Sequence, residues 1–138
     1  MADPDCLFCK IVAGEIPSHT VDEDDRTIAV MDINPWTRGH ALVIPKEHSR
    51  NIYDIAQDDL AAASSAAQRL ARQMRDRLSC EGINVVQSSE PAAMQTVFHY
   101  HLHVIPRYSD DGLKLAPHPQ AAEHEELAAL AEELRAHG

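Results

Sequence analysis

The stretch His99-Tyr100-His101-Leu102-His103-Val104-Ile105 places a histidine at every second position, with apolar residues between and after them. Successive side chains of an extended strand point to opposite faces, so the three histidines are predicted to line one surface. Neighbouring histidines in such a row lie roughly 6.6 Å apart. The row can therefore place the middle ring at a reacting centre with the outer two beside it. The alternate residues, predicted to face the core, are Phe98, Tyr100, Leu102 and Val104.

An alternative is that these histidines have no chemical role, which is usual for a single histidine on a half-buried strand. Three buried imidazoles in strict alternation would need several hydrogen-bond partners. The pattern therefore favours a functional site.

The length and composition indicate one domain over residues 1–138, since 138 residues with 44% hydrophobic residues can form a single core. No stretch is long and apolar enough to span a bilayer. The acidic segment Met1-Ala2-Asp3-Pro4-Asp5 lacks the apolar core of a signal peptide. The sequence thus predicts a cytoplasmic protein with no membrane partner.

A formal net charge of −10 argues against non-specific binding to nucleic acid. It does not exclude a small anionic ligand, because backbone amides, imidazoles, Lys46 or Arg107 can act locally. The odd count of three cysteines argues against a disulfide framework.

Hydrophobic periodicity and turn residues predict an α+β protein. The clearest helix is 58–78, with Asp58 or Asp59 as N-cap. No GxGxxG or P-loop pattern is present, which excludes those phosphate-binding solutions. His19, His118, His124 and His137 are expected at the surface. Short helices are expected at 6–12 and 123–135, a loop at 88–94, and strands at 21–24, 27–32, 40–44, 83–87 and over the histidine run, which Pro106 is expected to end.

The residues Gln95-Thr96-Val97-Phe98-His99-Tyr100-His101-Leu102-His103 resemble the motif of the histidine triad (HIT) family, in which alternating histidines follow a Gln-Ser/Thr-Val segment. Three more blocks match in order: 6–17, Asp32-Ile33-Asn34-Pro35, and 39–48. The resemblance covers about residues 5–108, and residues 109–138 form a C-terminal tail. It implies a HIT-like fold, a five-stranded antiparallel sheet with one long and one short helix, and a homodimer.

The resemblance also implies a nucleotide hydrolase or transferase, and a nucleoside phosphoramidase-like activity first of all. His101 would attack the α-phosphorus of a purine nucleotide conjugate and form a covalent nucleotidyl-histidine, because a neutral imidazole is a competent nucleophile near pH 7. His103 would contact phosphoryl oxygens or the leaving group, Thr96 would assist that group, and His99 completes the triad. No catalytic metal is required. His40, in a matched block, is expected to orient the site.

By the same resemblance, apolar residues flank the base, Asp32 accepts hydrogen bonds from the ribose hydroxyls, and Ser88 and Gln95 contact the nucleotide. Ordinary core packing is nearly as good a reading for each apolar residue alone, and Asp32 before Asn-Pro could be a turn residue. The residues expected at the base are Leu7, Phe8, Ile11 and Ile33.

Cys6-x-x-Cys9 is a spacing that can bind one metal ion, and two inert buried thiols are an almost equal alternative. A redox CxxC is disfavoured, because only five residues lie upstream and no strand precedes it. Bacterial HIT proteins often hold a structural zinc at positions that correspond here to Cys6, Cys9, His48 and His99.

The loop before the triad departs from the family pattern, because residues 88–94 contain no glycine. Glu90 would repel a phosphate if it pointed inward, and the alternative is that it points to solvent. Other functions stay open: dinucleoside polyphosphate hydrolysis, or a non-catalytic nucleotide-binding dimer. A metal-dependent hydrolase with the strand histidines as ligands is weaker, because no nearby carboxylate completes a catalytic set.

Overall fold

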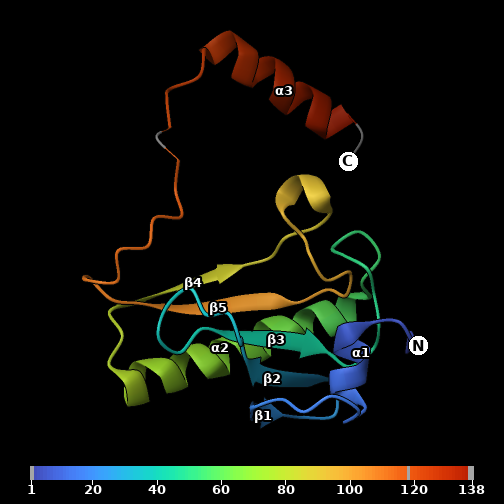
Figure 1. Ribbon diagram of the computed structural model, residues 1–138. Coiled ribbons are helices and arrows are strands. Elements are labelled where there is room, and N and C mark those ends of the chain that lie inside the picture. Colours follow the sequence, from blue (N-terminus) through green and yellow to red (C-terminus); the bar gives the residue numbers. More distant parts are fainter. Residues whose placement is uncertain (1, 118, 137–138) are drawn as a thin grey trace.

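Five strands form one antiparallel sheet in the order β1-β2-β3-β5-β4 (Figure 1). The computed structural model describes residues 2–117 and 119–136, so His118 and His137 lie outside the described residues. The strands are β1 (Thr20–Glu23), β2 (Thr27–Met31), β3 (Ala41–Pro45), β4 (Gly82–Val86) and β5 (Leu102–Arg107), and the helices are α1 (Leu7–Val12), α2 (Gln57–Leu78), the 3₁₀ turn η1 (Pro91–Ala93) and α3 (His124–Ala136).

Both faces of the central strands are covered, which explains why β2 and β3 are continuous apolar runs. Because successive side chains of a strand point to opposite faces of the sheet, each strand contributes residues to two cores. In β3, Ala41 and Val43 pack with Leu70 and Met74 of α2. The residues on the opposite face pack with α1, in a cluster that contains Phe8, Cys9, Ile28, Val30, Leu42 and Ile44.

The predicted α+β class and the expected sheet and helices are confirmed, with most ends shifted by one or two residues. The N-cap of α2 is Ala56, so the prediction of Asp58 or Asp59 was wrong. Both aspartates lie in the first turn, where their charges stabilise the helix through its dipole. The expected loop before the triad contains the 3₁₀ turn η1.

The histidine strand is shorter than predicted, because β5 begins at Leu102 and both His99 and His101 precede it. The amide of Tyr100 donates to the carbonyl of Ser49 at 2.8 Å instead of joining a strand ladder. Phe98 was predicted in the core, but it is 38% exposed. Pro106 does not end β5: it pairs with Ile83 of β4 and lies beyond the last pair between β5 and β3.

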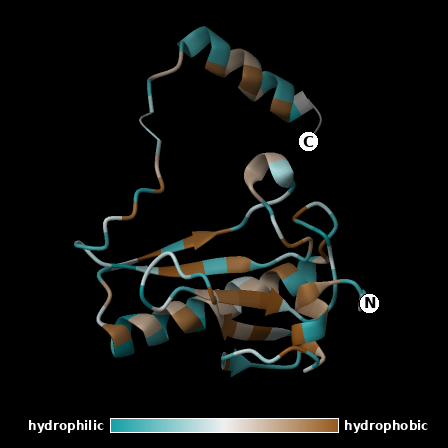
Figure 2. Cartoon of the chain, viewed as in Figure 1, coloured by the Kyte–Doolittle hydropathy of each residue, from teal (hydrophilic) through white to brown (hydrophobic). Residues whose placement is uncertain are grey.

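The C-terminal helix α3 stands away from the sheet at the end of an extended segment (Figure 1). Its apolar residues alternate with charged ones (Figure 2), and Leu127 and Leu130 are each 48% exposed. Within the described ranges, no helix combines the length and the apolar character needed to cross a membrane.

Candidate functional site

Three short segments bring the site residues together: the start of α1, the turn between β2 and β3, and the chain that leads into β5. The middle histidine, His101, is buried and lies edge-on to Phe8, with 4.9 Å between ring centroids. Its Nδ1 lies 2.7 Å from the carbonyl oxygen of His99. A carbonyl only accepts, so Nδ1 carries the proton and Nε2 keeps a lone pair.

The His101 ring is neutral near pH 7, because burial lowers its pKa. The hydrogen bond to the His99 carbonyl and the charge of Asp32 oppose that shift. A neutral imidazole with Nε2 free and Nδ1 held is the form needed for nucleophilic attack.

The first histidine of the row belongs to a Cys–His cluster, which consists of Cys6, Cys9, His48 and His99. The Nδ1 of His99 lies 3.3 Å from Cys6 Sγ, 3.6 Å from Cys9 Sγ and 3.2 Å from His48 Nδ1. Tetrahedral zinc at its usual bond lengths would separate sulfur from nitrogen by about 3.5 Å and two nitrogens by about 3.3 Å. The donor set and its spacing therefore fit zinc.

The outer contacts of the Cys–His cluster also suit a metal. His99 Nε2 lies 2.7 Å from the carbonyl oxygen of Pro45, so Nε2 donates its proton there and the Nδ1 lone pair faces the thiols. Asp3 Oδ2 lies 4.0 Å from Nε2 of His48. Burial raises the pKa of the Cys6 thiol and lowers the pKa of His99 to about 4. A metal bound here would displace the thiol protons.

The last histidine of the row belongs to an Asp–His cluster, which consists of Asp32, His40 and His103. His40 is fully buried, and its Nε2 lies 2.9 Å from His103 Nδ1 and 3.5 Å from Asp32 Oδ2. Burial, followed by the neighbouring rings of His101 and His40, lowers the pKa of His103 to about 4. Burial likewise lowers the pKa of His40. Asp32 lies far from the histidine row in the sequence, and the fold places its carboxylate beside it.

Sequence reasoning missed Trp36, which stacks on His103 with 5.4 Å between centroids and 14° between ring planes. An aromatic residue inside the matched block 32–48 was the available signal. Gly39 shapes the same turn with φ +94°, a region that L side chains rarely adopt. A Cβ at Gly39 would lie 2.5 Å from Leu78 Cδ1 of α2, so any other residue there would have to displace that side chain as well as adopt an unfavourable φ.

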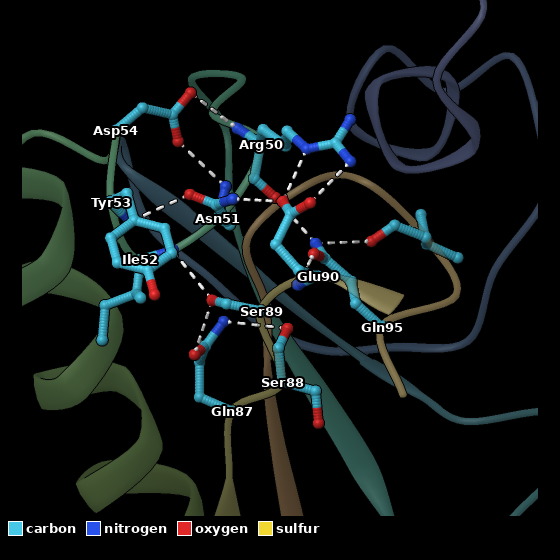
Figure 3. Close-up of polar contacts among 11 residues, drawn as sticks. Arg50, Asn51, Ile52, Tyr53, Asp54, Gln87, Ser88, Ser89, Glu90 and Gln95 are labelled. Carbon is cyan, nitrogen blue, oxygen red and sulfur yellow. Dashed lines mark hydrogen bonds and ion pairs between the residues drawn. The ribbon is translucent and has the colours of Figure 1, made fainter. Parts of the chain in front are cut away.

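The glycine-free loop is clamped to the segment after His48 (Figure 3). Arg50 donates twice to the Glu90 carboxylate, at 2.7 and 3.0 Å, and Asn51 donates to it as well. The amide of Ile52 donates to Ser89 Oγ at 3.0 Å. The Glu90 carboxylate therefore binds Arg50 and Asn51. It does not face a phosphate as a free charge, and it does not simply point to solvent.

Gln95 and Ser88 lie in this clamped region, and Thr96 follows it at the surface. The side chain of Gln95 is buried, accepts from the amide of Glu90 and donates to the carbonyls of Arg50 and Val97. A nucleotide contact by Gln95 would therefore have to replace one of these bonds. Ser88 is half-buried, and its carbonyl accepts from the side chain of Gln87.

The residues expected at the base divide into two groups. Phe8 is buried and Ile11 packs against the same cluster, whereas Leu7 is 44% and Ile33 is 83% exposed. Asp32 combines both of its expected roles: Oδ1 accepts from the amide of Asn34 in a turn, and Oδ2 lies near His40. Oδ2 retains accepting capacity for a hydroxyl group.

Alternating histidines that lead into a strand of an antiparallel sheet, beside a Cys–His cluster, define a class of proteins with known relatives. The HIT domain profile matches residues 13–110 of this chain. The structure of SMU.412c from Streptococcus mutans superposes with a TM-score of 0.94 at 39% identity, covering 99% of this chain and 87% of that one. The chain belongs to the HIT domain family.

Two further relatives are informative about the site. The chain is 38% identical over 135 residues to adenosine 5'-monophosphoramidase HNT1 of Saccharomyces cerevisiae, covering 97% of this chain and 83% of that protein. It is also similar to a Zn-bound histidine triad family protein from Mycobacterium smegmatis, at 41% identity with a TM-score of 0.78. That match covers 96% of this chain and 97% of the other.

Proposed function

We propose that this protein binds purine nucleotide conjugates and cleaves a nucleoside phosphoramidate, or a related nucleoside monophosphate conjugate, at the α-phosphorus. The observation that carries the proposal is the 2.7 Å hydrogen bond from His101 Nδ1 to the His99 carbonyl, which leaves Nε2 as a lone-pair donor. The similarity to a yeast adenosine 5'-monophosphoramidase supports the substrate class.

The reaction would proceed in two displacements. The Nε2 lone pair of His101 forms a bond to phosphorus while the bond from phosphorus to the leaving amine breaks, and the amine takes up a proton. Water then attacks phosphorus, the bond to His101 breaks and the nucleoside monophosphate leaves. We place Thr96 at the leaving group and His103 at the phosphoryl oxygens, where charge develops.

For the nucleotide we propose an apolar base site with Asp32 at the ribose hydroxyls and Ser88 on the phosphate side. Its apolar contacts would come from Leu7, Phe8, Ile11 and Ile33, and the buried Gln95 would support the loop. The exposure of Leu7 and Ile33 beside the buried Phe8 supports an open apolar surface at this end of the site.

We further propose a structural zinc in the Cys–His cluster, which would join the N-terminal segment to the sheet. Zinc held there would supply no reaction chemistry, since four protein ligands close its coordination shell. A homodimer, with two sheets joined across a two-fold axis, also belongs to this proposal. The edge strand β4, where Val85 is 52% exposed, supports such pairing, and sedimentation equilibrium tests it.

The test compares the wild type, His101→Ala and the surface control His19→Ala on adenosine 5'-phosphoramidate, with release of AMP as the readout. We expect His101→Ala to lower kcat by roughly 10³-fold or more and His19→Ala to leave it unchanged. Mass spectrometry of wild-type protein quenched at alkaline pH should detect a nucleotidyl adduct. Undiminished activity of His101→Ala would overturn the assignment.

The same assay addresses the other functions. Diadenosine polyphosphates test for a hydrolase of dinucleoside polyphosphates, and nucleotide binding without any turnover would identify a non-catalytic nucleotide-binding protein.

A further inference from the structure

We propose that Glu90 is a specificity-determining residue: it neutralises Arg50 at the leaving-group side of the site and thereby disfavours leaving groups that carry phosphate. Amines would be preferred over the phosphate chain of a dinucleoside polyphosphate. The identity of the reaction rests on the proposed function, whereas the pairing of Arg50 with Glu90 is a property of the fold.

The backbone of Glu90 has a conformation that is unusual for a glutamate. Its φ is 75° and its ψ is 157°, in a region that is almost restricted to glycine. Glycine would adopt this conformation at no steric cost, whereas a side chain makes it unfavourable. A residue held in such a conformation is a candidate for a functional role, and the contacts of its side chain indicate which role.

Three donors engage the Glu90 carboxylate (Figure 3). Arg50 Nε lies 2.7 Å from Oε2 and Arg50 Nη2 lies 3.0 Å from Oε1, which is the two-point pairing that a guanidinium forms with a carboxylate or a phosphate. The side-chain amide of Asn51 also donates to Oε2. The hydrogen bonds between Arg50 and Glu90 lower the pKa of Glu90 and raise the pKa of Arg50, so both groups are charged near pH 7 and the pair is neutral.

The Arg50–Glu90 pair borders the expected position of the leaving group. Gln95 donates to the Arg50 carbonyl at 2.7 Å and accepts from the Glu90 amide at 2.6 Å, and the next residue is Thr96, which the proposed function places at the leaving group. The guanidinium carbon of Arg50 lies 4.4 Å from the centre of the Phe98 ring. This contact would keep the guanidinium in place without Glu90, and its charge would then be free to bind a phosphate.

The other polar groups of the loop also bind mainly to one another. The Ser89 hydroxyl donates to Gln87 at 3.0 Å, and the Gln87 amide donates to the carbonyl of Ser88 at 3.1 Å. Among the described residues 87–95, the Ser88 hydroxyl is the one side-chain donor without a hydrogen-bond partner (Figure 3). The backbone amides that donate within the loop are those of Glu90, Ala93, Met94 and Gln95.

The two substrate classes make different demands on this loop. In a phosphoramidate the bond from phosphorus to nitrogen breaks, and the leaving amine takes up a proton. In a dinucleoside polyphosphate the bond from the α-phosphorus to the bridging oxygen breaks, and a nucleotide with several negative charges leaves. Phosphate chains are bound by cationic side chains or by several free amides. A neutral Arg50–Glu90 pair with one free hydroxyl therefore favours the amine.

The experiment frees Arg50 in two ways and measures both substrates. Glu90→Gln keeps the size of the side chain and removes its charge, whereas Glu90→Gly also relieves the backbone. We expect each to raise the ratio of kcat/KM for diadenosine triphosphate to kcat/KM for adenosine 5'-phosphoramidate about tenfold, the effect of one charged hydrogen-bonded contact. Removal of both charges in the double variant Arg50→Gln/Glu90→Gln should abolish the gain. Asp76→Asn is the matched control, because Asp76 pairs with Arg75 at 3.0 Å on the surface of α2 and its loss changes the net charge equally.

Equilibrium binding provides a measurement that does not need turnover. Isothermal titration calorimetry with AMP and ADP, carried out on His101→Ala protein, reports the affinity added by one phosphate beyond the α-phosphate. We expect the affinity for ADP relative to AMP to rise about tenfold when Glu90→Gln is added. An unchanged ratio, or an equal gain in the variant that also lacks Arg50, would overturn the inference. If the wild type cleaves neither substrate, the proposed function fails, while the ADP-to-AMP ratio still decides the role of Glu90.

Discussion

The Cys–His cluster and the Asp–His cluster lie at opposite ends of the histidine row, and each brings two histidines and other ligand atoms within 4.8 Å of one another. They differ in the backbone group at the far nitrogen of one histidine. In the Cys–His cluster the carbonyl of Pro45 takes the proton of His99 and leaves a lone pair for a metal. In the Asp–His cluster the amide of Trp36 occupies the lone pair of His40 and leaves a proton facing inward. The backbone partner of one histidine thus decides whether a lone pair or a proton faces the interior of the cluster.

Removal of a thiol should have the largest effect on stability. Its effect on zinc binding should distinguish the Cys–His cluster from the Asp–His cluster. We expect Cys9→Ser to lose zinc and more than about 4 kcal/mol of unfolding free energy, because metal binding contributes directly to folding. Asp32→Asn should keep one zinc per chain. Metal analysis and urea unfolding measure both, and equal zinc loss in the two variants would contradict the contrast.

Asp32→Asn should instead affect the nucleotide. The asparagine oxygen can still accept from the amide of Asn34, but its NH₂ group cannot accept from a ribose hydroxyl. We expect KM for a ribonucleotide substrate to rise roughly tenfold with kcat nearly unchanged. A substrate that lacks both ribose hydroxyls should show no such difference between wild type and variant, and an equal KM increase for it would refute the ribose contact.

Acid should destabilise the Asp–His cluster through His103. Its pKa is about 4 in the folded protein against 6.5 as the usual value, so the unfolded chain binds more protons between those pH values. This contribution to stability is complete above pH 6.5 and is lost as the pH falls toward 4. The loss is at most about 1.4 kcal/mol per pH unit.

Urea unfolding of zinc-loaded wild type and His103→Asn at pH 7 and pH 5 tests this dependence. The wild type should lose more stability than the variant over that interval. Parallel losses would show that His103 does not titrate in this way.

The clamped loop should show the smallest effect, and it differs from both clusters because an ion pair, between Arg50 and Glu90, helps to hold it. Met94 has φ +72° and is 76% exposed, so its side chain contributes little while its backbone is strained. We expect Met94→Gly to raise the free energy of unfolding by about 1 kcal/mol. Met94→Ala keeps the Cβ and is the matched control, and an equal gain there would exclude strain as the cause.

The sequence was sufficient to predict the sheet and the helices, and to single out the four residues that form the Cys–His cluster, because these depend on periodicity and on motif blocks. It could not predict the protonation of the three histidines. That depends on backbone atoms of Pro45, His99 and Trp36, and no residue type encodes where those atoms lie. The chain also leaves the strand register before Leu102, which alternation alone does not reveal.

Glu90 illustrates a second limit of prediction. Its sequence context allowed an inward or an outward carboxylate, but the actual partner, Arg50, lies 40 residues away and binds through two of its guanidinium nitrogens. Asp32 similarly approaches His40 only because β2 and β3 are adjacent. Contacts of this kind come from the tertiary fold.

The space at Gly39 also restricts how this protein can evolve. A methyl group at that position would lie 2.5 Å from the tip of Leu78, so even alanine requires that side chain to move at the far end of α2. Substitutions that are each harmful alone are seldom accumulated together. Variation at Gly39, in the turn before His40, is thus expected to be coupled to the packing of Leu78.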